Sequence, residues 1–400
     1  MSMNEVPVAE RLHIAFFGCR NAGKSSVVNA VTGQSIAVVS DIKGTTTDPV
    51  SKTMELLPLG PVVIIDTPGF DDEGPLGALR VGKTKEILNK TDIAVLVVDS
   101  TYGLNEFDRQ LITFFEAKKI PYIIVFNKAD LLENIPANSA SSVYVSAVTG
   151  MGIYELKESI GKILSLDQNK KSVISDLIEK DDNIILVCPI DQSAPKGRLI
   201  LPQQRIIRDI LDIGAHAFVT KETELQTAMQ SLKNAPKMVI TDSQVLAVVE
   251  KIVPEEVPLT TFSILMARYK GFLETAVESI AKAKHLKEGE KILMAEGCTH
   301  HRQCNDIGTV KIPRLLQKYC GCSLHFDTCT GEQFPDDLSQ YRLVIHCGGC
   351  MNTERDIRYR MRSTVDRGVP FTNYGIALAF LTGTLKRTLA CFEDIRKMII

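Results

Sequence analysis

The chain reads GCRNAGKS at residues 18–25, directly after the apolar run His13–Phe17 and before a helical pattern. A glycine-rich loop with this spacing between a strand and a helix is a P-loop, in which backbone N–H groups and the helix N-terminus bind phosphate. We expect Lys24 to bridge the β- and γ-phosphates of a nucleotide and the Ser25 hydroxyl to bind Mg²⁺. A chance glycine-rich loop is the alternative, and the strand–loop–helix context counts against it. The predicted nucleotide contacts in this loop are Gly18, Asn21, Ala22, Gly23, Lys24, Ser25 and Ser26.

Two motifs expected at Mg²⁺ and the γ-phosphate follow the P-loop. The chain reads GTTTD at residues 44–48, where Thr46 is favoured over Thr45 as the Mg²⁺ ligand. A second motif, DTPG, begins at Asp66, which is expected to hold a Mg²⁺-bound water, while the Gly69 N–H contacts the γ-phosphate. The predicted catalytic residues are Lys24, Thr46 and Gly69.

Two further motifs predict that the base is guanine. The sequence NKAD at residues 127–130 ends another apolar run. The Asp130 carboxylate can accept hydrogen bonds from both N1–H and the exocyclic amine of guanine, a donor pattern that adenine lacks. Residues 146–147 are then expected to cover the guanine carbonyl. The predicted nucleotide is therefore GTP, bound with Mg²⁺, and the predicted base contacts are Asn127, Lys128, Asp130, Ser146 and Ala147.

The residues that follow the DTPG motif predict slow intrinsic hydrolysis of GTP. Phe70 stands where many GTPases carry a glutamine that orients the attacking water. The acidic run 71–73 is close enough to position water, but a solvated loop is the favoured interpretation. The motifs resemble those of Era- and TrmE-like GTPases, in which GTTxD and DTPG are typical. In that branch an asparagine at the position of Asn21 helps to hold K⁺, which implies K⁺-stimulated hydrolysis. The alternative is that Asn21 only shapes the loop.

The composition predicts a cytoplasmic protein. A net charge of −2 argues against large surfaces for nucleic acid or for anionic membranes. No apolar run approaches the roughly 18–20 residues that a membrane helix needs, and residues 1–12 lack the apolar core of a signal peptide. The ten cysteines are therefore expected to be thiols or metal ligands rather than disulfides. We predict no nucleic-acid partner and no membrane partner.

Short apolar runs alternate with helical patterns, which predicts the α/β class with mainly parallel sheets. We expect three domains: a P-loop GTPase domain over residues 1–167, and two smaller α/β domains over residues 172–268 and 271–400. The predicted strands are His13–Phe17, Val62–Asp66, Ile93–Asp99, Tyr122–Asn127, Val143–Ser146, Asn183–Pro189, Ala217–Thr220, Met238–Thr241, Thr260–Leu265, Lys291–Ala295, Ser323–Asp327, Tyr341–Ile345 and Pro370–Asn373.

Residues 172–268 show no catalytic pattern. Cys188 and His216 are isolated there, and packing or exposure is a better explanation for each than metal binding. The edge strand of a small parallel sheet can pair with a second copy of the chain. The predicted role of this domain is therefore homodimerisation.

The last domain carries a metal-binding pattern. HCGGC at residues 346–350 pairs with CTH at residues 298–300, and each segment follows a predicted strand. The carboxyl ends of parallel strands converge, so Cys298, Cys347 and Cys350 are expected to meet. Three thiolates with a histidine fit Zn²⁺ and equally fit a 4Fe–4S cluster with one exchangeable ligand. The spacing does not choose between them. The further candidates are His300 and His346 as ligands, and Glu296 and Asp306 as oxygen donors.

The other cysteines and one histidine are expected to lie outside the metal site. Cys19 belongs to the P-loop, and its side chain is expected to face the protein. His301 is expected at the surface or behind the ligands. The cysteines expected to pack as small apolar residues are Cys304, Cys320, Cys322, Cys329 and Cys391.

A TrmE-like GTPase, a middle α/β domain and a C-terminal CxH…HCxxC together resemble the maturation GTPase family of FeFe-hydrogenase (HydF). The stretches CTHH 298–301, DIGTVKIP 306–313 and HCGGC 346–350 match the family pattern, although residues 301–345 make a slightly shorter gap than usual. The resemblance covers essentially the whole chain. It implies a scaffold that binds a 4Fe–4S cluster through Cys298, Cys347 and Cys350, with His300 and His346 in the cluster environment.

The resemblance also implies partners. Two radical-SAM maturases build a di-iron unit that this scaffold assembles or delivers to apo FeFe-hydrogenase, while GTP biases partner exchange. The alternative is a TrmE/Era-like regulatory GTPase of RNA modification or ribosome assembly with a structural zinc module. The near-neutral charge and the lack of a visible RNA-binding motif count against it. A third, weaker alternative is a GTPase that inserts another metal.

Overall fold

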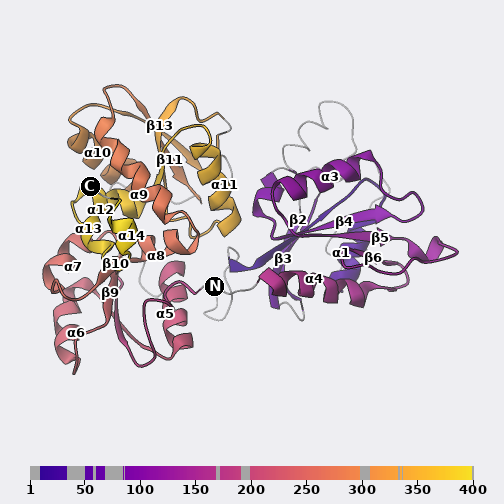
Figure 1. Cartoon of the computed structure of the whole chain (residues 1–400), viewed down its shortest axis with the longest axis horizontal. Coiled ribbons are helices and arrows are strands. Elements are labelled where there is room, and N and C mark those ends of the chain that lie inside the picture. Colours follow the sequence, from indigo (N-terminus) through magenta and orange to yellow (C-terminus); the bar gives the residue numbers. More distant parts are fainter. Residues whose placement is uncertain are drawn as a thin grey trace. The chain divides into compact units, whose positions relative to one another are not determined.

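The computed structural model describes residues 10–33, 50–56, 60–67, 84, 86–167, 172–190, 199–297, 307–331, 334–335 and 337–398. The chain divides into two compact units, Met1–Lys170 and Lys171–Ile400. In Figure 1 the first unit runs from indigo to magenta and the second from pink to yellow. Each unit is built from parallel strands with helices packed on them, as an α/β sequence predicts.

The first unit contains a six-stranded sheet in the order β2-β3-β1-β4-β5-β6. Only β2 is antiparallel to its neighbour; the other pairs are parallel. The strands are β1 Leu12–Phe17, β2 Val50–Leu56, β3 Gly60–Asp66, β4 Ile93–Asp99, β5 Tyr122–Asn127 and β6 Ser142–Tyr144. The helices are α1 Lys24–Thr32, α3 Glu106–Ala117 and α4 Ile153–Asp167, with a 3₁₀ turn at Ala129–Leu131.

Helices cover both faces of this sheet. Ile14 and Phe16 of β1 share a buried cluster with α1 and α4, whereas Ala15 and Phe17 share another with α3. Figure 1 shows α3 across the sheet from α1 and α4. A strand buried on both faces needs apolar side chains at every position. For this reason β1 appears in the sequence as an unbroken apolar run that ends at the P-loop.

The second unit contains two four-stranded parallel sheets, in the orders β10-β9-β7-β8 and β12-β11-β13-β14. One continuous apolar core joins them. The first sheet and its helices are β7 Asn183–Val187, α5 Leu201–Ile213, β8 His216–Thr220, α6 Leu225–Ser231, β9 Met238–Thr241, α7 Leu246–Ile252, β10 Leu259–Thr261 and α8 Phe262–Tyr269. The second group is α9 Leu273–Ala281, β11 Lys291–Glu296, α10 Ile312–Cys320, β12 His325–Thr330, β13 Tyr341–His346, α11 Glu354–Val365, β14 Phe371–Asn373, α12 Tyr374–Leu381, α13 Leu385–Thr388 and α14 Glu393–Arg396.

The structure confirms the predicted α/β class with mainly parallel sheets. A six-stranded sheet with the P-loop comes first along the chain, and two smaller parallel sheets follow. Two local predictions were wrong. Strand β2 was missed, and the strand predicted at Thr260–Leu265 ends at Thr261. The Thr261 hydroxyl accepts a hydrogen bond from the Ile264 N–H at 3.2 Å and caps α8, so the chain turns helical within that apolar run.

The helices were compared with what a membrane-spanning helix requires. None of those in the described ranges combines the length and apolar composition that crossing a membrane would require.

Candidate functional site

The P-loop passes very close to its neighbouring strands. Gly18 has φ 144°, and a Cβ there would lie 2.2 Å from the Val97 carbonyl oxygen. Gly23 has φ 82°, and a Cβ there would lie 2.2 Å from Nδ2 of Asn127. Both glycines are therefore required by space as well as by backbone conformation. Gly23 is also the N-cap of α1 and supplies no side-chain cap, so the start of this helix is suited to binding an anion.

Two predicted Mg²⁺ contacts lie together beside this loop. The Ser25 hydroxyl donates to Oδ2 of Asp66 at 2.8 Å. The other carboxylate oxygen, Oδ1, is buried and has no hydrogen-bond partner among the described residues. Burial raises the pKa of Asp66, while the Lys24 ammonium and the Ser25 hydroxyl lower it. A Mg²⁺-bound water would satisfy the remaining oxygen, so the donor set fits this ion.

The two motifs predicted to bind guanine lie at the same end of the sheet as the P-loop. Nδ2 of Asn127 donates to the Ala22 carbonyl at 3.0 Å, and its Oδ1 accepts from the Ala147 N–H at 3.1 Å. Asn127 therefore links the P-loop to residues 146–147. Lys128 pairs with Asp99 at 2.5 Å. Asp130 is exposed on the 3₁₀ turn, where its carboxylate is accessible to a base.

The Cys19 side chain packs against the start of α3. Its sulfur lies 3.6 Å from Oδ1 of Asp108 and accepts from Nδ2 of Asn105 at 3.2 Å. Asn105 is the N-cap of α3. These contacts confirm that Cys19 faces the protein.

Several predicted contacts of the nucleotide site fall outside the described residues. They are residues 44–48, which include Thr46, and residues 68–73, which include Gly69 and Phe70. Their roles stay predictions.

The segment that carries Cys347 and Cys350, called the cysteine loop below, begins where two parallel strands end side by side. Ala295 of β11 pairs in register with His346 of β13, so Gly297 and Cys347 emerge at the same edge of the sheet. The Cys347 sulfur accepts the Gly297 N–H at 3.1 Å and the Gly349 N–H at 3.3 Å. Burial raises the pKa of Cys347 to about 11, and the two N–H donors oppose that shift. A thiolate here needs a positive partner, and N–H donors to sulfur are typical of metal-bound thiolates.

Cys350 lies half-buried at the end of the same loop, just before α11. Within the described ranges, no three His, Cys, Asp or Glu side chains form a group that could hold a metal ion. Cys298 and His300 lie outside those ranges, as do His301, Cys304 and Asp306. The predicted three-cysteine ligand set therefore stays a prediction.

His346 is buried and hydrogen-bonded through both ring nitrogens. Nδ1 lies 2.8 Å from the Cys347 carbonyl oxygen, and Nε2 lies 3.2 Å from Nη1 of Arg360. The carbonyl requires Nδ1 to donate, and the guanidinium requires Nε2 to accept. Burial, followed by the Arg360 charge, lowers the pKa of His346 to about 4, so the ring is neutral at pH 7. Ligation of iron by His346 stays a prediction, and it would require one of these bonds to break.

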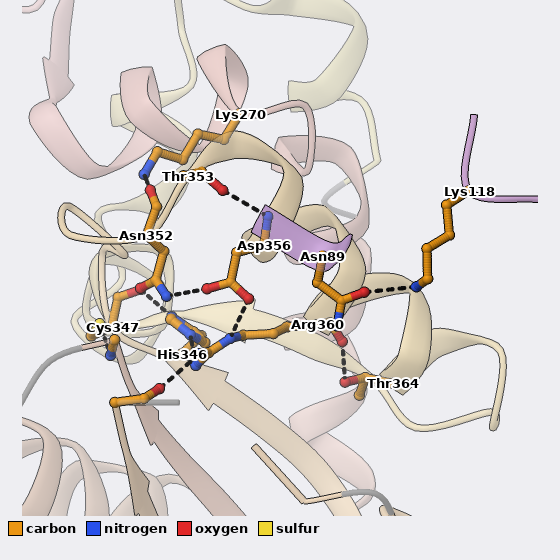
Figure 2. Close-up of polar contacts among 12 residues, drawn as sticks. Asn89, Lys118, Lys270, His346, Cys347, Asn352, Thr353, Asp356, Arg360 and Thr364 are labelled. Atoms are coloured by element: carbon orange, nitrogen blue, oxygen red, sulfur yellow. Dashed lines mark hydrogen bonds and ion pairs between the residues drawn. The ribbon is translucent and has the colours of Figure 1, made fainter. Parts of the chain in front are cut away.

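Arg360 of α11 is the centre of a buried polar network behind the cysteine loop (Figure 2). It is 2% exposed and donates to Oδ1 of Asp356 at 3.2 Å and to the Gly331 carbonyl at 2.7 Å. Asn352 also donates to Asp356, through Nδ2. Asp356 and Arg360 belong to no motif in the sequence. Their one local signal is the spacing of an Asp–Arg pair at i and i+4 on the helix that follows CxxC.

Replacing Arg360 with methionine is expected to destabilise the second unit by about 3–5 kcal/mol, because it leaves the buried Asp356 carboxylate without its cation. Urea denaturation followed by circular dichroism measures this loss. The matched control is Arg362→Met, an exposed position on the same helix, which should change the free energy of unfolding by less than about 0.5 kcal/mol. Equal midpoints for the two variants would contradict the role of the network.

Three other residues considered as metal ligands, Glu296, Cys188 and His216, lie within the described ranges. Glu296 is 5% exposed and accepts from the Tyr374 hydroxyl at 3.4 Å. Burial raises the pKa of Cys188 to about 12, in keeping with packing, and His216 is exposed. The described cysteines form no disulfide with one another; they are Cys19, Cys188, Cys320, Cys322, Cys329, Cys347, Cys350 and Cys391.

Three protein-family models match the chain. A 50S ribosome-binding GTPase model matches residues 13–128. The dimerization domain of hydrogen maturase F matches residues 173–271, and the tetramerization domain of hydrogen maturase F matches residues 274–391. The two maturase models together span most of the second unit.

Individual related proteins match a smaller part of the chain than the family models do. A tRNA modification GTPase MnmE from Endomicrobium trichonymphae is 34% identical over 172 residues, which is 41% of this chain and 38% of that protein. GTPase Der from Kosmotoga olearia is 32% identical and covers 38% of each chain. The chain thus spans well under half the length of these curated relatives. Among solved structures, the G domain of the T. maritima FeoB iron transporter is 25% identical with a TM-score of 0.30, covering 39% of this chain and 99% of that one. A bacterial selenocysteine-specific elongation factor is 22% identical with a TM-score of 0.34, covering 40% of this chain and 30% of that one.

Proposed function

The chain belongs to the hydrogen maturase F family, and on that premise we propose that it is a GTP-hydrolysing scaffold for FeFe-hydrogenase maturation. It binds a 4Fe–4S cluster and assembles or delivers the di-iron unit to apo FeFe-hydrogenase, together with two radical-SAM maturases. It acts in the cytoplasm, without a nucleic-acid or membrane partner.

One observation carries the cluster proposal. The Cys347 sulfur accepts two backbone N–H groups at the edge of a parallel sheet, and Cys350 follows on the same loop. Cys298 completes three thiolate ligands. The cluster would supply an iron with an exchangeable fourth ligand, which suits a scaffold that must release its cargo. The di-iron unit is that cargo.

The GTPase site would act on partner exchange rather than on the cluster. Lys24 and the first N–H groups of α1 bind the phosphates, while Ser25, Thr46 and Asp66 hold Mg²⁺ and its water. The Gly69 N–H senses the γ-phosphate. Loss of this contact after hydrolysis is the ordinary GTPase switch.

The potassium proposal rests on Asn21. Its backbone is left-handed, with φ 62°, a conformation that asparagine tolerates and glycine adopts freely. We expect KCl to stimulate GTP hydrolysis relative to NaCl in the wild type, and Asn21→Gly to abolish the stimulation while keeping the loop conformation. Hydrolysis assays in the two salts measure this. Equal wild-type rates in KCl and NaCl would rule the proposal out.

A homodimer is proposed through the sheet that contains β8. This strand is at the edge of the sheet, and its Val219 side chain is 48% exposed. No strand of the described ranges pairs with the outer edge of β8. A sheet edge with an apolar side chain favours association, and the dimerization-domain match supports it. Light scattering of the full chain should return about twice its mass of 44.1 kDa or a higher multiple; a monomer mass would contradict the proposal.

The second candidate is a regulatory GTPase of RNA modification with a structural zinc module. The similarity to tRNA modification GTPases favours it, although that similarity covers only about two fifths of the chain. The two maturase matches over residues 173–391 favour hydrogenase maturation instead.

Maturation in vitro tests the proposed function. Apo FeFe-hydrogenase, incubated anaerobically with this protein and the two maturases, should evolve hydrogen from reduced methyl viologen. Omission of this protein should abolish that activity. Equal activity with and without it would refute the proposal.

A further inference from the structure

A buried lysine from outside the cysteine segment reaches the loop that carries Cys347 and Cys350. Lys270 directly follows α8 and is 4% exposed. Its ammonium group donates to the Gly349 carbonyl and to the Asn352 carbonyl at 3.0 Å. These carbonyls stand on either side of Cys350. Figure 2 shows the Lys270 side chain extending to Asn352.

The backbone of Lys270 is fixed to the helix that follows the loop. Its carbonyl oxygen accepts from Nε of Arg358 on α11 at 2.9 Å. The adjacent Gly271 leaves room for this contact, because a Cβ there would lie 2.5 Å from Nη2 of Arg358. Lys270 is therefore held against the loop through both its side chain and its backbone.

The loop itself has little room to change shape. A Cβ on Gly297 would lie 1.7 Å from Oδ1 of Asn352, and one on Gly349 would lie 2.5 Å from Cδ1 of Ile357. A buried ammonium group is costly unless acceptors or negative charge surround it. Two carbonyl oxygens compensate part of that cost, and a metal-bound pair of thiolates next to them would add negative charge.

Lys270 is also close enough to act on the site electrostatically. Its ammonium group is bound by the Gly349 and Asn352 carbonyl oxygens, which flank Cys350. Arg360 contacts His346 directly, whereas Lys270 contacts the loop beyond Cys347. A 4Fe–4S cluster with thiolate ligands carries net negative charge that grows on reduction, and nearby charge is one determinant of its potential.

We propose that Lys270 is a positioning residue of the cluster site, which holds the Cys347–Cys350 loop in its binding shape and raises the reduction potential of the cluster. This inference rests on the proposed cluster function. Lys270 belongs to the segment that matches the dimerization domain, residues 173–271, whereas the cysteines belong to the segment that matches the tetramerization domain, residues 274–391. The site is thus built from both folds of the unit.

Three full-length variants test the proposal. Lys270→Met removes the charge and the donor, and Lys270→Arg keeps the charge. Lys291→Met is the matched control, because Lys291 is 44% exposed and lies at the opposite end of β11 from the cysteine loop. Each protein is reconstituted anaerobically with iron and sulfide. The midpoint potential is then measured by EPR-monitored titration, and iron loss to a chelator by absorbance.

Lys270→Met should lose iron about 10- to 100-fold faster than the wild type, the usual effect of removing an outer contact of a metal site. Its midpoint potential should be more negative. Lys270→Arg should recover the wild-type potential, and Lys291→Met should match the wild type in both measurements. Wild-type potential and iron loss in Lys270→Met would overturn the proposal, as would a Lys270→Arg potential equal to that of Lys270→Met.

Alkylation of the metal-free protein keeps this test separate from the proposed function. Iodoacetamide, with peptide mass spectrometry, reports how fast Cys347 and Cys350 react. If Lys270 holds the loop in shape, both cysteines should react faster in Lys270→Met than in Lys291→Met. Equal rates in the two variants would refute this role. A wild type that takes up no iron refutes the cluster proposal, whereas an iron-loaded wild type with an unchanged Lys270→Met refutes only this inference. If circular dichroism shows that Lys270→Met does not fold, Lys270→Gln replaces it in every comparison.

Discussion

Cys347→Ser is expected to lose the iron–sulfur cluster, reducing bound iron from about four atoms per chain to near zero. Serine oxygen is a poor substitute for the soft thiolate that iron prefers. The two N–H donors from Gly297 and Gly349 are also placed for a sulfur atom, at 3.1 and 3.3 Å. Iron analysis after anaerobic reconstitution measures the loss, and GTP turnover should stay at the wild-type rate.

The matched control is Cys391→Ser, another half-buried thiol of the same unit that lies between α13 and α14. It should keep its iron. The same loss is expected for Cys298→Ser and Cys350→Ser, and full iron in all three variants would show that the ligand set is wrong.

Lys24→Ala is expected to reduce GTP hydrolysis by at least about 10²- to 10³-fold, the usual cost of removing one group that stabilises transition-state charge. Lys24 is the first residue of α1, only 9% exposed, and acts electrostatically on Asp66. Its ammonium group is thus held beside the proposed Mg²⁺ site. Phosphate-release assays measure the change.

Lys52→Ala serves as the control, because Lys52 is exposed on the edge strand β2. It should hydrolyse GTP at the wild-type rate. Both variants should load a full cluster, because the cysteine loop belongs to the other unit. Wild-type hydrolysis in Lys24→Ala would contradict the P-loop assignment.

The fold could be predicted where burial dictates composition. Strands β4 and β5 match the predicted ranges because central parallel strands are apolar at nearly every position. Strand β2, with the sequence VSKTMEL, lies at the sheet edge, and three consecutive polar residues, 51–53, leave it without the apolar run that marks the central strands. Strand β10 is three residues long, and its apolar run continues into α8. Only the capping hydrogen bond of Thr261 marks the boundary.

Some residues of the functional sites could likewise be predicted from the sequence, and others could not. The P-loop, Asn127 and Cys347 were predictable because their chemistry depends on local spacing along the chain. Lys270 and Arg360 were not, because their contacts are tertiary. Lys270 and Gly349 are 79 positions apart, and Arg360 and Gly331 are 29 apart. Lys270 reaches the loop from the end of α8, and Arg360 reaches His346 from α11, so only the folded structure shows that both cations lie there.

We propose that one chain combines a GTPase fold with an iron–sulfur site. Anaerobic reconstitution of the wild type with iron and sulfide, followed by metal analysis and EPR of the dithionite-reduced protein, tests it most directly. We expect about four irons per chain and an S = ½ signal, and we expect both to be absent from Cys347→Ser. A colourless protein with stoichiometric zinc and no EPR signal would contradict it and indicate a GTPase with a structural zinc module.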